Sequence, residues 1–198
     1  MVDAEMSAHS ARTHGLSAAD EWFSPRELQA LADAAIPQWY AAQTCANHER
    51  RVADQLAGRA IETLLPTYES VRPRSDRKVT LQRPLFSGYV FVRIPLVERM
   101  RVLEVRGVAQ LVSFGGRPAP LDEHEIAAIT HMLGSGYRME PHPYLSLGRR
   151  VRITSGPLRG LQGIIERQKN RARFVVAIDL ISRAIAVEVT DADIEPQF

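Results

Sequence analysis

The sequence predicts an α+β domain, made of an antiparallel sheet with one helical layer, followed by a small all-β barrel. Three observations predict this division. Strand-like and helix-like segments alternate up to about residue 134, and glycine and proline then punctuate residues 135–148. The remaining residues form short, evenly spaced strands without a helical pattern.

Residues 1–37 form an acidic leader, with two cations and six acids, ahead of a basic remainder that holds the other 23 cations. We expect the leader to be disordered except for a short helix over about 25–35. Ser24, Pro25 and Glu27 predict the start of this helix, because they match a capping box with proline at the first helical position. The helix is interpreted as a loosely held appendage or as a docking element for a partner.

Residues 38–134 carry the elements of the first domain. Strands are expected where aromatic and β-branched residues gather, and helices where apolar residues recur at every third or fourth position. The expected strands are 39–44, 61–70, 85–93 and 108–114, and the expected helices are 48–59, 96–105 and one capped by Asp122. Residues 72–78 are too charged for a core element and predict a loop or hairpin tip.

Residues 135–148 are predicted to be a linker, and residues 149–198 the all-β domain. Its expected strands are 151–153, 163–166, 174–179 and 184–189, separated by turns. The density of valine, isoleucine and phenylalanine in this tail favours strands over helices, so we expect a stable barrel.

Composition excludes several classes of protein. Hydrophobic residues make up 45% and charged residues 24% of the 198-residue chain, which is typical of globular proteins. A single cysteine, Cys45, excludes a disulfide framework and a cysteine-rich zinc site. The sequence contains neither an apolar run of about 18 residues nor a secretory signal, so we expect a cytoplasmic monomer without membrane contact.

Catalytic and cofactor motifs are missing from the sequence. The six histidines form no HExxH pattern, and no GxSxG elbow is present. The glycine-rich run from Gly156 to Gly163 lacks the Gly-Lys-Ser/Thr ending of a phosphate loop. We therefore expect neither enzymatic activity nor a metal or other cofactor.

Features of surface recognition remain. Five cations and one acid lie between Arg72 and Arg83, an arrangement that suits phosphate contact but also suits an ordinary solvated loop. In the strand that follows, alternation places Tyr89 and Phe91 on one face and Phe86 on the other. One aromatic set is expected in the core and the other in a binding patch, and alternation alone does not decide which.

The chain resembles the NusG family of transcription elongation factors over about residues 38–196. In the first domain the matching stretches are Trp39-Tyr40, Pro84–Val92, Arg106–Val108, Val112–Leu121 and Glu125-Ile126. The tail resembles a KOW domain, an SH3-like barrel, at Val151–Ile153, Gly156–Leu158, Gly163–Ile165, Ile181–Arg183 and Val187–Val189. Two motif sets in the family's order make this resemblance specific.

The resemblance implies a non-catalytic factor that grips the clamp coiled coil of bacterial RNA polymerase and suppresses pausing or termination. By position, the implied polymerase-binding residues are Trp39, Tyr40, Leu85, Phe86, Tyr89 and Arg99. The residues that the resemblance places at the non-template DNA strand are His48, Arg51 and Arg106. The cations of the basic loop that are also expected to bind nucleic acid are Arg77, Lys78 and Arg83. Rho or a ribosomal small-subunit protein is the implied partner of a KOW surface at Ile153, Leu158 and Ile181.

Departures from the housekeeping pattern favour a specialised, operon-specific antiterminator related to RfaH. Ser87 stands where housekeeping members usually carry proline, and Leu158 where they carry an aromatic residue. The alternatives are a housekeeping factor and an RNA-binding KOW protein of the translation machinery. Some RfaH-like members fold the tail as a helical hairpin that masks the polymerase site, which the strand-rich tail disfavours here.

Overall fold

The computed structural model describes residues 24–73, 78–143, 149–168, 171–189 and 194–196. Residues 1–34 and 35–198 are separate compact units. In the described part of the first unit, α1 (Pro25–Ala35) begins at the proline that the capping pattern indicated. The disorder expected for the leader, and the side chain of Arg77, lie outside the described residues.

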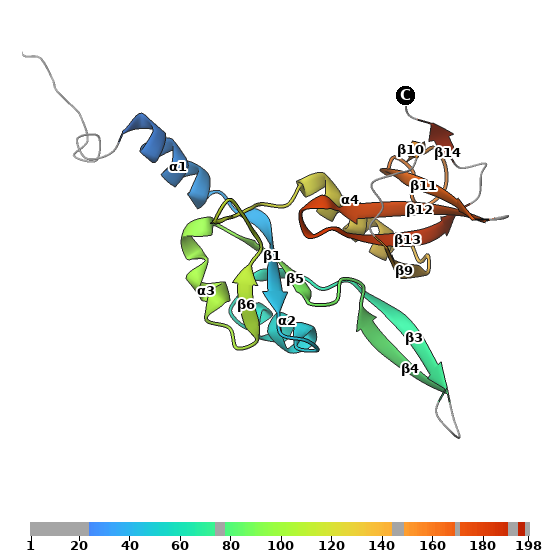
Figure 1. Ribbon diagram of the computed structural model, residues 1–198, viewed down its shortest axis with the longest axis horizontal. Helices are drawn as coiled ribbons and strands as arrows, with labels where there is room; N and C mark the ends of the chain where they lie inside the picture. Colours follow the sequence, from blue (N-terminus) through green and yellow to red (C-terminus); the bar gives the residue numbers. More distant parts are fainter. Residues whose placement is uncertain (1–23, 74–77, 144–148, 169–170, 190–193, 197–198) are drawn as a thin grey trace, which may run out of the picture. The chain divides into compact units, whose positions relative to one another are not determined.

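The second unit begins with a four-stranded antiparallel sheet in the order β2-β5-β1-β6 (Figure 1). Its strands are β1 (Gln38–Thr44), β2 (Glu62–Leu64), β5 (Tyr89–Ile94) and β6 (Val108–Leu111). The helical elements around it are α2 (Glu49–Ala57), η1 (Leu96–Glu98), α3 (Met100–Leu103) and α4 (Glu123–Gly134). As the sequence indicated, Asp122 caps α4 by accepting a hydrogen bond from the His124 N–H at 2.8 Å.

Helices cover both faces of this sheet, so the expectation of a single helical layer was wrong. Val90 and Val92 of β5 share one buried cluster with Val52 of α2 and Val102 of α3. Phe91 shares the other cluster with residues of α4. A strand with an unbroken apolar run is buried on both faces, and that composition was the available signal for two layers.

The central strand also starts later than expected. It begins at Tyr89, because Gly88, with φ of +85°, turns the chain in a conformation that side-chain-bearing residues rarely adopt. The turn breaks the alternation assumed for residues 85–93. Phe86 and Phe91 therefore lie in the same cluster and meet edge to face, with ring centroids 5.2 Å apart, instead of on opposite faces.

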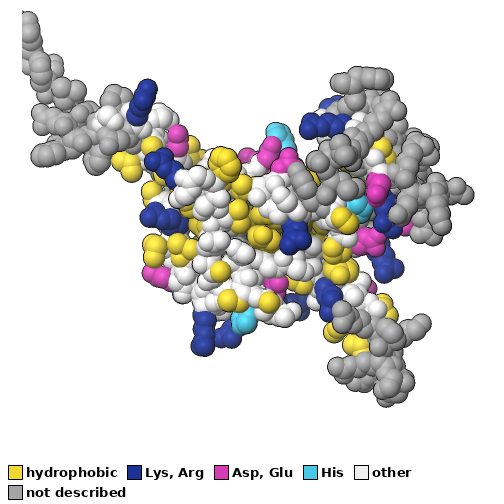
Figure 2. Space-filling model, viewed as in Figure 1, with side chains coloured by type: hydrophobic (Ala, Val, Ile, Leu, Met, Phe, Trp, Pro, Cys, Tyr) yellow, Lys and Arg dark blue, Asp and Glu magenta, His cyan; other side chains and the backbone are white. Residues whose placement is uncertain are grey.

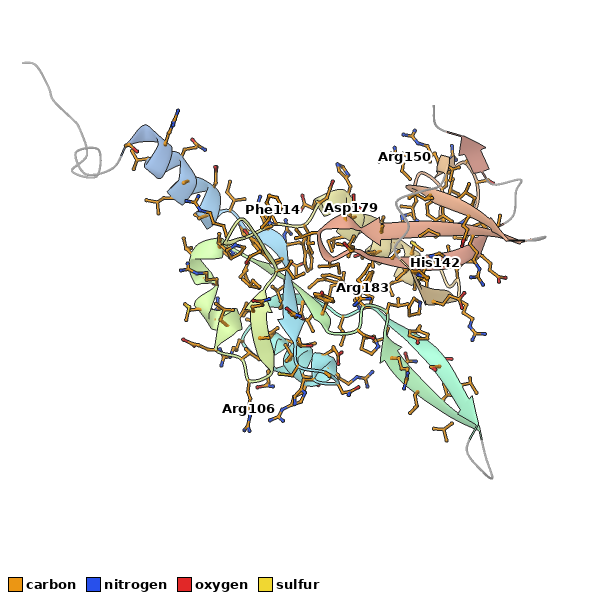
Figure 3. The ribbon with its side chains drawn as sticks, in the orientation of Figure 1. Arg106, Phe114, His142, Arg150, Asp179 and Arg183 are labelled. Carbon is orange, nitrogen blue, oxygen red and sulfur yellow. The ribbon has the colours of Figure 1, made fainter. Side chains whose placement is uncertain are left out.

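Two small hairpins extend this part of the chain. β3 (Thr67–Pro73) pairs with β4 (Lys78–Pro84) on either side of the residues expected at a loop or hairpin tip. β7 (Ser113–Phe114) pairs with β8 (Arg117–Pro118). Phe114 is 82% exposed in the second hairpin (Figure 3).

The C-terminal residues form a six-stranded antiparallel sheet in the order β14-β10-β11-β12-β13-β9. Its strands are β9 (Met139–His142), β10 (Arg149–Ile153), β11 (Gln162–Gln168), β12 (Arg171–Ile178), β13 (Arg183–Val189) and β14 (Ile194–Pro196), with η2 (Asp179–Ile181) between β12 and β13. The expectation of antiparallel sheets in both parts of the chain is confirmed.

β9 lies inside the segment expected to be a linker. It pairs with the edge of β13, from Met139 opposite Val187 to His142 opposite Ala184. Two polar contacts add to this pairing: Arg173 Nη2 lies 3.1 Å from Glu140 Oε1, and His142 Nε2 lies 2.8 Å from Glu166 Oε2. The glycines and prolines around β9 favour the prediction of a linker. No local pattern indicates the strand, because its pairing partner lies about 45 positions later in the chain.

Candidate polymerase and nucleic-acid interface

Four of the six residues expected to contact polymerase are part of one hydrophobic cluster, which we call the α4 cluster. Leu85 and Phe86 are buried in it, with 3% and 1% exposure, and Trp39 and Tyr89 pack against it half-buried. Tyr40 belongs to the cluster on the opposite face of the sheet, together with Val52 of α2. The expected set is therefore divided by the sheet.

Arg99 lies apart from both clusters. It is exposed between η1 and α3. Val97 and Met100, on either side of it in the chain, are 54% and 51% exposed. These residues form a mixed cationic and apolar surface on a different element from the aromatic set.

The α4 cluster extends into the C-terminal sheet. Leu158, Ile178 and Ile181 belong to it together with Ile129 and Met132 of α4. Ile153, Leu158 and Ile181, the residues expected at the KOW partner surface, are only 2%, 2% and 7% exposed. In this structure that surface is covered.

Two polar contacts accompany this packing. Glu125 Oε1 accepts a hydrogen bond from the Asp179 N–H at 3.2 Å, and His131 Nε2 lies 2.6 Å from the carbonyl oxygen of Pro157. Partial burial raises the pKa of the Glu125 carboxyl, and the nearby charges of Asp179 and Asp122 add to that effect, while the Asp179 N–H lowers the pKa. Both contacts join α4 to turns of the C-terminal sheet.

Three of the residues expected at DNA gather near the start of α2. His48 precedes the helix, and Arg51 follows one turn later on an exposed face. Gly107, the residue after Arg106, lies against His48: a Cβ at Gly107 would be 3.4 Å from the His48 Cβ. Arg106 is therefore close to His48 in space. Arg106 is exposed and points away from the sheet (Figure 3). This cationic group is defined by His48, Arg51 and Arg106.

Arg83 lies apart from the cationic group. It lies at the end of β4 and lines a cavity of about 650 Å³ between the start of α2 and the base of the β3–β4 hairpin, which we call the α2–hairpin cavity. The backbone of Lys78 pairs with Pro73 at the far end of the hairpin. On the face seen in Figure 2, lysine and arginine side chains form separate groups rather than one continuous patch.

Sequence reasoning missed two cavity residues, Asn47 and Arg50. The predicted set contains Arg51 and not Arg50, and the two side chains face different surroundings because consecutive helical residues point about 100° apart. Asn47 adopts φ of 60°, a conformation that asparagine tolerates better than most residues. The run Asn-His-Glu-Arg at residues 47–50 spans the predicted start of the helix, and it was the signal in the sequence that could have identified both residues.

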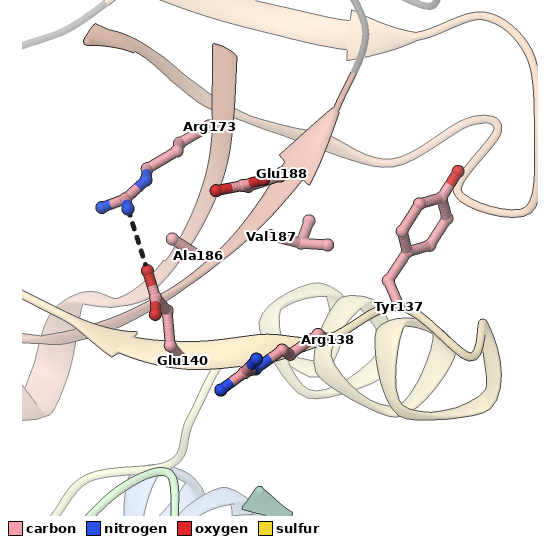
Figure 4. A pocket seen from close by; sticks show the side chains of 7 residues that line it. All are labelled: Tyr137, Arg138, Glu140, Arg173, Ala186, Val187 and Glu188. Carbon is pink, nitrogen blue, oxygen red and sulfur yellow. Dashed lines mark ion pairs between the residues drawn. The ribbon is translucent and has the colours of Figure 1, made fainter. Parts of the chain in front are cut away.

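A second cavity, of about 440 Å³, lies along β9 and β13 (Figure 4). The ion pair between Arg173 and Glu140 crosses its wall. Arg138, Glu188 and the half-exposed Tyr137 also line it, so the charged lining consists of two arginines and two glutamates. This mixture gives no net attraction for an ion of either sign.

No group of three or more histidine, cysteine, aspartate or glutamate side chains among the described residues is arranged to hold a metal ion. None of the helices in the described ranges combines the length and the apolar character that crossing a membrane requires.

Comparison with known proteins connects this geometry to a family. Residues 37–130 match the family model described as "Transcription termination factor nusG". "Transcription termination/antitermination protein NusG" of Yersinia pestis is 28% identical over 180 residues, covering 83% of this chain and 99% of the relative. The Vibrio vulnificus protein of the same name is also 28% identical, over 83% of this chain and 98% of its own length.

A solved structure, "Domain interaction in Thermotoga maritima NusG", is 25% identical, covers 82% of this chain and aligns with a TM-score of 0.48. NusG-family factors are non-enzymatic transcription regulators, and this agrees with the expectation that the chain is not an enzyme. Residues 37–130 thus match the NusG family's domain, and the chain is similar to transcription termination/antitermination proteins NusG over most of its length.

Proposed function

We propose that this chain binds the clamp coiled coil of RNA polymerase through the aromatic side of the α4 cluster and suppresses pausing or termination. The observation that carries this proposal is the grouping of Trp39, Leu85, Phe86 and Tyr89 in one cluster. Aromatic side chains that are partly exposed beside a fully packed base are typical anchors of a protein interface.

The burial of Leu85 and Phe86 has a consequence for this proposal. A coiled coil that reaches them must replace some of the packing that α4 and the C-terminal sheet share in the same cluster. The two polar contacts at Glu125 and His131 must then open as well. Polymerase binding and docking of the C-terminal sheet on α4 are therefore coupled in our proposal, and each weakens the other.

The cationic group is proposed to contact the displaced non-template DNA strand. His48, Arg51 and Arg106 come from two elements and lie on the side of the domain that carries α2. Exposed cations supply sequence-independent affinity for phosphates, which suits a factor that follows a moving transcription bubble.

We infer that the part of the C-terminal sheet from β10 to β14 is a KOW domain of the SH3-like barrel type, with its boundary near residue 149. Its support is the run of short antiparallel strands from β10 to β14 and the helical turn η2 at the Ile181 motif. Its partner is proposed to be Rho or a ribosomal small-subunit protein at Ile153, Leu158 and Ile181. Since those residues are buried here in the same cluster as Ile129 and Met132 of α4, we propose that this partner also requires the sheet to leave α4.

The proposed activity is operon-specific antitermination. Ser87 is exposed at the turn before β5, and Leu158 presents an aliphatic side chain at the KOW turn; these are the two positions at which the chain departs from the housekeeping pattern. Transcription through a terminator, with and without the protein on generic and cognate templates, separates an operon-specific factor from a general one.

The experiment for polymerase contact compares Tyr89→Ala with Tyr137→Ala in capture by purified polymerase. Tyr89 is half-buried against the α4 cluster, whereas Tyr137 is 38% exposed outside it. Tyr89→Ala should weaken capture about tenfold or more, as expected for an interface anchor, and Tyr137→Ala should leave it unchanged. Equal capture of the two variants would contradict the proposed contact.

A further inference from the structure

The α2–hairpin cavity is separate from the proposed aromatic contact and from the cationic group. It lies between the start of α2 and the base of the β3–β4 hairpin, and its volume of about 650 Å³ exceeds that of a single nucleotide. Two arginines line it: Arg50, which is exposed, and Arg83, which is half-buried. Among the ion pairs found between described residues, none uses either guanidinium. Both side chains are therefore available to an anion.

The backbone at this end of α2 favours the same ligand. His48 makes no side-chain cap for the helix, and Asn47 turns the chain into it with φ of 60°. The N–H groups of a first helical turn attract negative charge when no side chain caps them. Thr44 on the cavity wall is 7% exposed, and its Oγ1 has no hydrogen-bond partner within the described residues.

One acidic residue, Glu49, also lines the cavity. It is 6% exposed, and its Oε1 accepts a hydrogen bond from the Gly88 N–H at 2.8 Å. The carboxylate is therefore held against the backbone of the turn rather than extended into solvent. The exposed charge at the cavity mouth is that of the arginines.

The remaining walls suit a base rather than a simple anion. Leu81, which is 42% exposed, and Pro84 present an apolar surface. The side-chain amides of Asn47 and Gln82 are next to it, and Gln82 Nε2 is oriented by a 3.2 Å hydrogen bond to Glu69 Oε1. Apolar or guanidinium planes stack on a base, and amides pair with its edge.

We propose that the α2–hairpin cavity binds one unstacked nucleotide of single-stranded DNA. The phosphate lies against Arg50, Arg83 and the first turn of α2, and the base packs on Leu81 and Pro84. This inference rests on the proposed function, which supplies a displaced DNA strand. A paired base reaches such a cavity only after unstacking, so the site favours single-stranded over duplex DNA.

The test measures binding of a fluorescein-labelled, 12-nucleotide single-stranded DNA to the full-length protein by anisotropy over a range of salt concentrations. Arg50→Gln and Arg83→Gln should each weaken binding about five- to tenfold and lower the salt slope by about one, as expected for the loss of one phosphate contact. Arg117→Gln removes the same charge from the exposed β8 hairpin and should change affinity less than about twofold.

A variant that keeps all charges distinguishes a cavity from a charged surface. Ala46 is exposed and lines the cavity, so Ala46→Trp should fill it and weaken single-strand binding to the extent of the arginine variants. Circular dichroism melting confirms that the variant is folded. Wild-type affinity in folded Ala46→Trp, or equal losses in Arg50→Gln and Arg117→Gln, would overturn the proposal.

Two further arms complete the experiment. Duplex DNA of the same sequence should bind less tightly than the single strand, and equal or tighter duplex binding would overturn an unstacked base in the cavity. Single-stranded RNA that binds tighter than DNA would overturn the assignment to DNA. Capture of the protein by polymerase is measured in parallel, without nucleic acid. If polymerase captures the protein but the cavity variants bind single-stranded DNA as tightly as the wild type, the cavity proposal alone is rejected. If polymerase does not capture the protein but the cavity variants clearly lose DNA affinity, the proposed function alone is rejected.

Discussion

The carboxylate of Glu49, at the start of α2, accepts a hydrogen bond from the backbone N–H of Gly88, with Oε1 and N 2.8 Å apart. The two residues are 39 positions apart in the sequence, and the bond connects α2 to the turn that precedes the central strand. Thr44 N–H donates to the Gly88 carbonyl at 2.8 Å, so both polar groups of this glycine are paired. The turn that carries Leu85 and Phe86 is thereby anchored to the helix that carries the cationic group.

Glu49→Ala should lower the free energy of unfolding by about 1 kcal/mol, because it leaves the half-buried Gly88 N–H without its acceptor. Glu49→Gln keeps an acceptor oxygen and should lower it less. Urea denaturation measures both. Asp54→Ala on the exposed side of the same helix is the control, and a Glu49→Ala midpoint equal to that of the control would contradict the role of this bond.

Gly163→Ala should destabilise the C-terminal sheet. A Cβ at this position would lie 2.6 Å from the Val175 carbonyl oxygen and 2.8 Å from the Phe174 ring, and neither backbone nor a fully buried ring yields easily. We expect a loss of about 1–3 kcal/mol in thermal or urea unfolding, as for overpacked cores. Gly134→Ala at the end of α4 meets no atom within 4 Å and should be neutral or slightly stabilising.

Glu125→Ala and His131→Ala should loosen the contact between α4 and the C-terminal sheet. Each removes a hydrogen bond to the backbone of a turn, at Asp179 and at Pro157. Amide hydrogen exchange should become faster at Asp179 in Glu125→Ala, with little change in the central strand β5. His124→Ala, an exposed neighbour on the same helix, should leave exchange at Asp179 unchanged. Unchanged exchange in both test variants would show that packing alone maintains the contact.

The proposed coupling makes a further prediction for the double variant Glu125→Ala/His131→Ala. If release of the C-terminal sheet precedes polymerase binding, the double variant should bind polymerase more tightly than the wild type, because less packing must be disrupted. Weaker or equal binding in a folded double variant would argue against the coupling. Capture by purified polymerase provides the measurement.

The raised pKa of Glu125 predicts a pH dependence of stability. Burial makes the folded state hold this proton more tightly than the unfolded chain, whose carboxyl has the usual pKa of 4.5. The free energy of unfolding should therefore fall as the pH rises from about 4.5 through the raised pKa. Glu125→Gln should flatten this segment of the stability curve. A wild-type curve parallel to that of Glu125→Gln between pH 4 and 6 would contradict the assignment.

Several elements were readable from sequence because their signals are local. Asp122 ahead of an apolar stripe marks the start of α4, and the Ser24-Pro25 pair marks the start of α1. Capping and periodicity act within one or two turns of chain, so a single sequence contains them. The charged segment likewise indicated a loop or hairpin tip at 72–78, but β4 (Lys78–Pro84) was not expected as a strand.

The placement of the site residues was not readable in this way. Alternation put Phe86 and Phe91 on opposite faces, but the turn at Gly88 brings their rings together. Adjacent Trp39 and Tyr40 were grouped together, yet a strand directs consecutive side chains to opposite faces, and both faces are covered here. The predicted linker conceals β9, whose hydrogen-bond partner is β13.

By itself, the sequence determined the order of the main strands and helices, the motifs that resemble the NusG family and the uneven charge of the chain, because these depend on residue types and short spacings. Only the tertiary structure decided that helices cover both faces of the sheet and that the expected KOW surface is buried in the same cluster as residues of α4. It also decided that Arg50 and Arg83 line one cavity. These features depend on contacts between residues that are tens of positions apart, and such contacts are specified by packing of the whole chain rather than by any local pattern.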